Sequence, residues 1–134
     1  MSLLEKWGKA LDNLDMDSLN EIYHDDYEFT LHSAGKTLNK KDVIDWIAMD
    51  DVVTKNFRIL YENDEIGVTH AVVKFKSDGN IQGVMSFFRF KDGKLFRHET
   101  GASNLPKEWK IFLIIIPKTK NPTHAGLKIV KINN

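Results

Sequence analysis

Cysteine is absent from this sequence, and its absence excludes a class of sites. Without cysteine there is no disulfide, no thiolate nucleophile and no sulfur ligand for a metal. A surplus of one charge sign is absent as well, because 19 Lys and Arg balance 19 Asp and Glu. A general binder of nucleic acid or of an anionic membrane carries a basic excess, so neither partner is expected.

Long apolar runs are also missing. No stretch approaches the roughly 20 apolar residues that span a bilayer, and the N-terminus lacks the basic and apolar segments of a signal peptide. We therefore expect a cytoplasmic protein. The length of 134 residues suits one domain with a real core.

The feature around which the rest is arranged is the stretch from Asn80 to Gly101. Its two arms, Val84 to Phe90 and Leu95 to Thr100, are rich in aromatic and β-branched residues, as strands are. Asp92-Gly93 between them is typical of a two-residue type I′ turn, which needs positive φ at both positions. This pattern predicts a β-hairpin at the centre of a curved antiparallel sheet.

Helical signals occupy the first half of the chain. Ser2 and Glu5 have capping-box spacing at the start of a helix that the apolar period extends to Leu14. Asp17 is the expected cap of a second, shorter helix, which Asp25-Asp26 would end, and Asn39 the expected cap of a third.

Period-two patterns predict the strands Tyr27–His32, Lys36–Leu38, Phe57–Tyr61 and Ile66–Phe75. Helices that precede a continuous run of strands indicate an α+β fold. We expect the curved sheet to wrap around the first and third helices as a half-open cone.

The last segment is of a different kind. Six apolar residues, Ile111 to Ile116, are followed by Pro117 and Pro122. This run is interpreted either as a buried last strand packed on the sheet or as the cover of a dimer interface. We predict a single domain over residues 1–134, with residues 106–134 as an atypical C-terminal extension.

The order of these motifs resembles the nuclear-transport-factor-2-like (NTF2-like) superfamily, in particular its SnoaL-like group. The resemblance is carried by WGKALDNLDMDSLNEIYHDDYEF from Trp7, by Asn39 to Trp46, and by FRFKDGKLFRHE. It implies a cone-shaped, cystatin-like α+β roll with a deep pocket between sheet and helices, and a homodimer formed through the sheet. The superfamily includes ketosteroid isomerases, polyketide cyclases, dehydratases and non-catalytic binding proteins, so fold alone does not give the chemistry.

The isomerase members can be compared without gaps from Trp7 to Leu31. Trp7 stands where those enzymes have the tyrosine that donates to the developing enolate, and Leu31 stands where they have the aspartate base. The steroid-isomerase mechanism is therefore not expected.

Polar residues within apolar strands are the candidates for chemistry, since each needs a partner when buried. His70 interrupts the apolar stripe of Ile66, Val68 and Val72, and His32 follows the position of the missing base. Either is a candidate acid or base. The alternative interpretation is a hydrogen-bonded core residue for His70 and a surface or capping residue for His32.

Glu99 could pair with His70 and orient its ring, and Tyr61 could donate to an oxyanion. One of His98 and Glu99 must face the concave side, and the sequence leaves open which one. The further candidate ligand contacts are Trp7, Phe29, Leu31, Trp46, Gln82, Ser86 and His98.

The five histidines have no metal-ligand spacing, and no glycine motif binds phosphate, so neither a metal nor a cofactor is expected. Three hypotheses remain. The first is a cofactor-free isomerase, cyclase or dehydratase acting on a small apolar carbonyl compound. The others are a non-catalytic binder of a small apolar ligand and a homodimeric interaction module.

Overall fold

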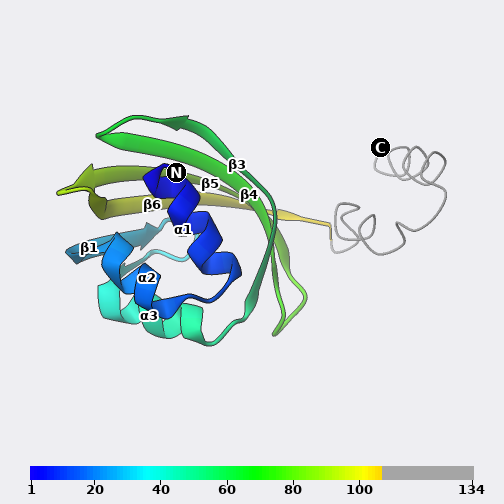
Figure 1. Cartoon of the computed structure of the whole chain (residues 1–134). Coiled ribbons are helices and arrows are strands. Elements are labelled where there is room, and N and C mark those ends of the chain that lie inside the picture. The colour runs from blue at the N-terminus through cyan, green and yellow to red at the C-terminus, as the bar shows by residue number, and fades with distance from the viewer. Residues whose placement is uncertain (107–134) are drawn as a thin grey trace, which may run out of the picture.

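The structure is a computed structural model of the chain, and it describes residues 1–106. Three helices lie on the concave side of one strongly curved sheet (Figure 1). The apolar run Ile111–Ile116 and nearly all of the predicted extension lie outside the described residues.

Each helix begins at a polar cap. α1 (Leu3–Asp12) has the predicted capping box, in which the Ser2 hydroxyl accepts from the Glu5 amide and the Glu5 carboxylate accepts from the Ser2 amide. α3 (Lys40–Ala48) has the same arrangement between Asn39 and Asp42.

α2 (Met16–Ile22) corrects the predicted cap. Asp15 accepts from the amide of Ser18 at 3.2 Å and from its hydroxyl at 2.7 Å, so it caps the helix. Asp17 lies in the first turn, where a carboxylate favours the positive end of the helix dipole. Asp15 and Asp17 are both acidic and lie two residues apart, so the sequence pattern did not show which of them is the cap.

β1 (Tyr23–Leu31) follows α2 directly, so Asp25-Asp26 lie within a strand instead of ending a helix. The Lys40 ammonium donates to the carbonyls of Asn20 and Tyr23 and to the Asp25 carboxylate. These bonds hold the end of α2 to the start of β1. The strand begins at Tyr23, four residues before the predicted start at Tyr27.

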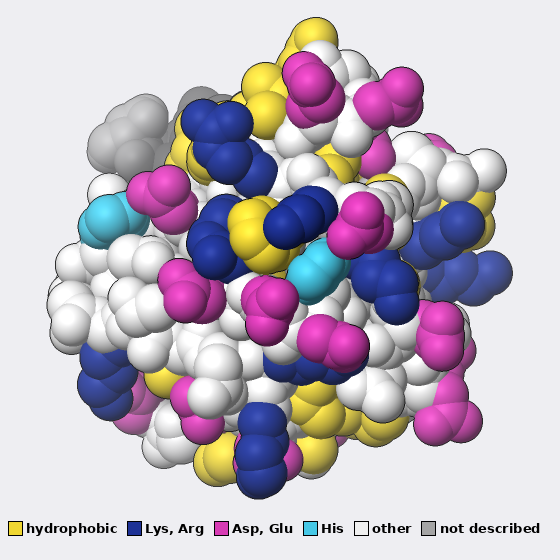
Figure 2. Space-filling view, turned by 90° about the vertical axis from the view of Figure 1, so that its left-hand side faces the viewer, with side chains coloured by type: hydrophobic (Ala, Val, Ile, Leu, Met, Phe, Trp, Pro, Cys, Tyr) yellow, Lys and Arg dark blue, Asp and Glu magenta, His cyan; other side chains and the backbone are white. Residues whose placement is uncertain are grey.

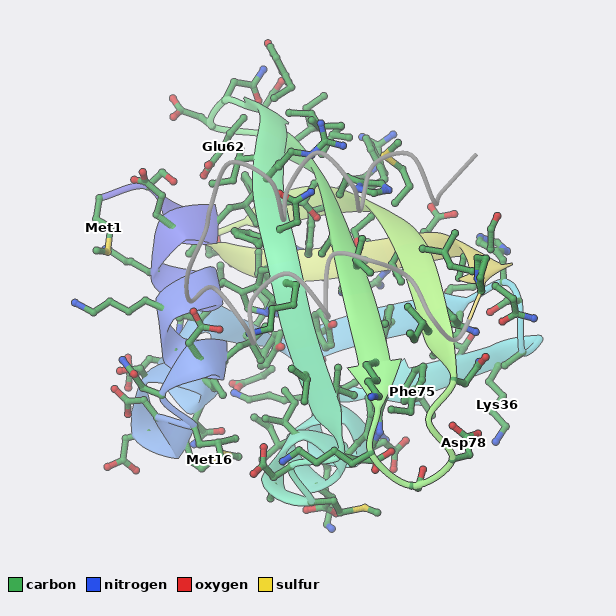
Figure 3. All side chains as sticks on the ribbon, turned by 90° about the vertical axis from the view of Figure 1, so that its right-hand side faces the viewer. Met1, Met16, Lys36, Glu62, Phe75 and Asp78 are labelled. Carbon is green, nitrogen blue, oxygen red and sulfur yellow. The ribbon has the colours of Figure 1, made fainter. Side chains whose placement is uncertain are left out.

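The remaining strands are β2 (Lys36–Asn39), β3 (Val52–Glu62), β4 (Ile66–Phe75), β5 (Ile81–Lys91) and β6 (Lys94–Leu105). β4 has the predicted bounds, and the other strands extend beyond theirs. Asp92 and Gly93 have φ of 55° and 73°, which confirms the predicted hairpin turn. Figure 3 shows β3 to β5 from outside, with Glu62 at the end of β3 and Asp78 in the β4–β5 turn.

The sheet order is β2-β1-β6-β5-β4-β3. All neighbouring strands are antiparallel except β1 and β6, which run parallel. The α+β cone is confirmed. The prediction of an antiparallel sheet is corrected, because β6, the last strand of the β3–β6 meander, pairs with β1 and runs parallel to it, which makes the sheet mixed.

Two faces of the sheet must be distinguished. The inner face turns toward the helices and contributes Tyr27, Phe29, Phe88 and Leu95 to the core, where they pack with Leu4 and Leu19 of the helices. The outer face carries the alternate residues of the same strands, since successive side chains of a strand point to opposite sides.

Candidate functional site

A cavity of about 400 Å³ lies between the inner face and the helices. This volume falls within the range of small-molecule sites. Its walls are mostly aromatic and aliphatic. They are formed by Trp7 and Leu11 of α1, Val43 and Trp46 of α3, and Phe29, Leu31, Phe57, Ala71, Val84 and Ala102 of the sheet.

All seven residues predicted as ligand contacts lie in the cavity wall. They are Trp7, Phe29, Leu31, Trp46, Gln82, Ser86 and His98. Trp7 of the first helix and Leu31 of the first strand therefore both add apolar surface to the cavity.

His98 is the titratable ring at the centre of this wall. Its side chain is only 5% exposed. The ring lies between the rings of Phe29 and Phe88, with centroid distances of 4.2 and 4.1 Å and interplanar angles of 17° and 25°. Trp7 meets it edge-on at 5.8 Å. These contacts fix the plane of the imidazole, so its nitrogens have defined directions.

Burial lowers the pKa of His98 from the usual 6.5 to about 3, because the apolar wall disfavours the charged ring. The imidazole is therefore neutral at pH 7 and carries one hydrogen. Which nitrogen holds that hydrogen decides what His98 can do in the cavity.

The hydroxyl of Tyr27 identifies the tautomer. It lies 2.9 Å from Nδ1 of His98, and this is its one hydrogen bond within residues 1–106. Tyr27 is buried, and burial raises its pKa well above 10, so the phenol keeps its hydrogen. We assign the phenol as donor and Nδ1 as acceptor, because the opposite arrangement would leave two buried groups unpaired, the phenolic hydrogen and the Nε2 lone pair, whereas this one leaves only the Nε2 hydrogen.

This assignment places the ring hydrogen on Nε2. That atom is buried and has no hydrogen-bond partner among the described residues. An unpaired buried donor costs about 1–3 kcal/mol. His98 is therefore a buried hydrogen-bond donor, and not a base, in the cavity wall.

Tyr23 supplies a second hydroxyl to the same wall. It accepts a hydrogen bond from the Trp7 indole nitrogen at 2.9 Å, and its own hydrogen has no acceptor in the described part of the chain. Burial raises the pKa of Tyr23, so it too keeps its hydrogen. Trp7 thus positions the hydroxyl of another cavity residue, Tyr23.

His70 lies elsewhere than predicted. Its neighbours Thr69 and Ala71 line the cavity, so His70 belongs to the outer face, opposite Arg58 on β3 and Met85 on β5. The apolar stripe that His70 interrupts is therefore the one on the outer face of β4. Both faces of this strand are apolar, so the composition of the stripe did not show which face it occupies.

Glu99 contacts His32 instead of the predicted partner His70. The His32 Nε2 and Glu99 Oε1 atoms are 2.9 Å apart, in side chains 60% and 52% exposed. Such exposed pairs contribute little to stability. Tyr61 is 52% exposed and accepts from the Asn63 amide group. None of His32, His70, Glu99 and Tyr61 lines the cavity.

Four charged residues line the cavity at its solvent end, and sequence reasoning missed them. Asp12, Asp50, Asp51 and Lys76 are exposed or half-buried. Asp12 is the last residue of α1, Asp50 and Asp51 lie between α3 and β3, and Lys76 follows the last residue of β4. Acidic residues at such positions are common, so their spacing gave no signal.

Figure 2 shows basic and acidic side chains interspersed over one face of the molecule. No group of three or more His, Asp or Glu side chains suited to a metal ion occurs within residues 1–106. In the same range, no helix is both long and apolar enough to cross a membrane.

Comparison with solved structures shows the NTF2-like fold. An NTF2-like protein of unknown function from Burkholderia xenovorans is 18% identical, with 82% of this chain and 88% of that chain covered and a TM-score of 0.61. A candidate ketosteroid isomerase from Kribbella flavida is 12% identical, with 78% and 77% covered and a TM-score of 0.66.

A candidate polyketide cyclase from Sinorhizobium meliloti is 18% identical, with 74% of this chain and 93% of that chain covered and a TM-score of 0.61. No protein-family model matches the sequence, and the search of curated proteins found no match. The chain therefore has the fold expected from the resemblance.

Proposed function

We propose that the protein binds a small, largely apolar compound whose buried part is uncharged and carries an oxygen acceptor, such as a ketone. The observation that carries this proposal is the buried and unpaired Nε2 of His98, a residue of the apolar cavity wall. A ketone oxygen would accept from Nε2–H and remove the cost of the unpaired donor. The apolar walls favour the hydrocarbon part of such a ligand.

A matched pair of ligands tests this proposal. We expect butyrophenone to bind, and its affinity to fall about tenfold in the variant Tyr27→Phe/His98→Phe. This variant removes both partners of one buried hydrogen bond and keeps an aromatic ring in the stack. Butylbenzene, which has no oxygen, should bind the variant at least as well as the wild type. Isothermal titration calorimetry measures all four affinities.

Replacement of His32, the exposed histidine of the outer face, by Asn is the control and should change neither affinity. An equal loss for ketone and hydrocarbon in the double variant would indicate a damaged cavity and contradict the hydrogen-bond role. Failure of butyrophenone to bind the wild-type protein would contradict the proposal itself.

A catalytic function is the second candidate: an isomerase, cyclase or dehydratase acting on a carbonyl compound. Some neighbours of the same fold are candidate isomerases and cyclases. A donor such as His98 would polarise the carbonyl and acidify its α-hydrogens. The proton acceptor would then be a carboxylate of the solvent end, since His32 and His70 lie on the outer face.

Exchange of the α-hydrogens of butyrophenone in D₂O distinguishes the two candidates. Mass spectrometry would show deuterium incorporation faster than in protein-free buffer if the protein catalyses enolisation. Binding without such acceleration is the result that we expect, because no base in the described residues lies beside His98.

We further propose that the protein forms the homodimer that the resemblance implies, through the outer face. This face exposes Tyr61 and Met85, at 52% and 47%, and Leu60 at 46%. Native mass spectrometry at micromolar concentration should give a dimer for the wild type and for the control Lys41→Glu on α3. A charge at the centre of the face, in Met85→Glu, should give a monomer. A monomeric wild type would contradict this expectation.

A further inference from the structure

The solvent end of the cavity carries an excess of negative charge. Three carboxylates and one ammonium line it, those of Asp12, Asp50, Asp51 and Lys76. Lys76 lies 3.2 Å from the Asp50 carboxylate and pairs with it. Asp51 accepts from the amide and hydroxyl of Ser77, which are neutral groups. Asp12 has no partner among the described residues. Two of the three carboxylates therefore lack a compensating cation.

Two helices add to this field. α1 ends at Asp12, and α3 ends at Ala48, two residues before Asp50. The C-terminal end of a helix carries roughly half a negative charge. Neither helix compensates it fully, since α3 has no basic residue in its last turn and α1 has only Lys9. Two carboxyl-terminal helix ends therefore add negative potential beside these lining aspartates.

The other polar feature of the cavity is of the opposite kind. The Nε2 of His98 lies in the buried wall, is neutral and donates. A ligand that satisfied both features would have an oxygen acceptor in its buried part and a positive charge at its exposed end. The aromatic side chains of Trp7 and Phe57, whose ring centroids are 5.8 Å apart, also line the cavity. They would contact the apolar part of such a ligand.

We propose that the ligand class is a small amine that also carries a carbonyl or ether oxygen, with its ammonium group held between Asp12 and the α3–β3 turn. This inference rests on the proposed function, because it uses the same cavity and the same donor. It adds the charge and the orientation of the ligand.

Three phenyl ketones of similar size test the proposal. Butyrophenone is neutral, 4-(dimethylamino)-1-phenylbutan-1-one is cationic at pH 7, and 4-oxo-4-phenylbutanoate is anionic. At low ionic strength we expect the cation to bind about tenfold more tightly than butyrophenone, and the anion more weakly than butyrophenone. Because the carboxylates are partly exposed, 0.5 M NaCl should reduce this preference.

Matched variants locate the charge effect. In Asp12→Asn/Asp51→Asn, which replaces the two carboxylates that lack a cation, the cation should lose its advantage over butyrophenone on the same variant to within about twofold. Asn at position 51 keeps a side-chain oxygen that can accept from the amide of Ser77. Asp64→Asn, in the β3–β4 turn and outside the cavity, is the control for a change in net charge and should keep the preference.

The outcomes separate the two proposals. If butyrophenone binds and the cation binds no better, or the anion binds best, the inference about charge is wrong and the oxygen-binding function stands. If the preference survives in Asp12→Asn/Asp51→Asn, the ammonium is not held at this end, and the inference is again wrong. If none of the three ketones binds, both proposals fail.

Discussion

Lowering the pH from 7 to 4.5 is expected to reduce the free energy of unfolding by about 2–3 kcal/mol through His98 alone. Burial holds the pKa of this ring at about 3 in the folded protein, against 6.5 in the unfolded chain. Between these values the unfolded chain binds a proton that the folded protein does not. The contribution is therefore fully present above pH 6.5 and is lost as the pH falls toward 3.

Urea unfolding at steps of pH measures this dependence. Carboxylates also titrate in the range, and hydrogen bonds lower the pKa of Glu5 and Asp15, so the wild-type slope alone is not diagnostic. The informative quantity is the difference from His98→Asn, whose side-chain oxygen can accept from Tyr27 but does not titrate.

This variant should lose the part of the slope that belongs to His98, whatever its stability at pH 7. His32→Asn, which removes an exposed histidine, should keep the slope. Equal slopes in the wild type and His98→Asn would mean that the ring is not held neutral by burial.

Phe88→Ala is expected to reduce the free energy of unfolding by about 3–5 kcal/mol. Phe88 is fully buried. Its ring stacks on His98 at 4.1 Å and meets Trp7 edge-on at 5.1 Å. Removal of the ring leaves a void beneath the imidazole that fixed neighbouring strands cannot fill. Thermal and urea unfolding measure the loss.

The neighbouring Phe87 provides the matched control, since it lies on the outer face and is half-buried. Phe87→Ala removes the same atoms and should cost less than half as much. Phe88→Leu, which retains most of the buried volume, should recover part of the stability. If Phe87 and Phe88 proved equally costly to replace, our division of the sheet into inner and outer faces would be wrong.

Much of the fold could be predicted from local chemistry. Ser2 with Glu5, and Asn39 with Asp42, determine where two helices begin because each pair satisfies backbone amides within one turn. Asp92-Gly93 determines the hairpin because both residues must adopt positive φ. Such signals involve few residues close in sequence and do not depend on the rest of the chain.

The faces of the strands could not all be predicted in the same way. β4 is apolar on both sides, so the stripe containing His70 could not be assigned to the inner or outer face from its composition. In β6, the register shift between Arg89 and Phe90 leaves Phe96 as an extra residue. This bulge places Leu95 in the core and Arg97 outside, although they are two residues apart, so alternation counted across it fails.

The candidate site shows the same division. The apolar wall was predictable, since aromatic residues at strand and helix periods must pack between sheet and helices. The pairing of Tyr27 with His98 joins residues 71 positions apart. It depends on the parallel register of β1 and β6, in which Phe29 lies opposite His98. No local pattern encodes that register.

The histidine ring ¹⁵N NMR spectrum of the full chain at pH 7, recorded with and without butyrophenone, tests the central claim most directly. His98 is assigned by its loss in His98→Asn. We predict a neutral ring with hydrogen on Nε2 and none on Nδ1, and an Nε2–H signal that moves downfield with butyrophenone but not with butylbenzene. Hydrogen on Nδ1, or a charged ring, would contradict the account, because His98 would then not be a neutral donor at Nε2.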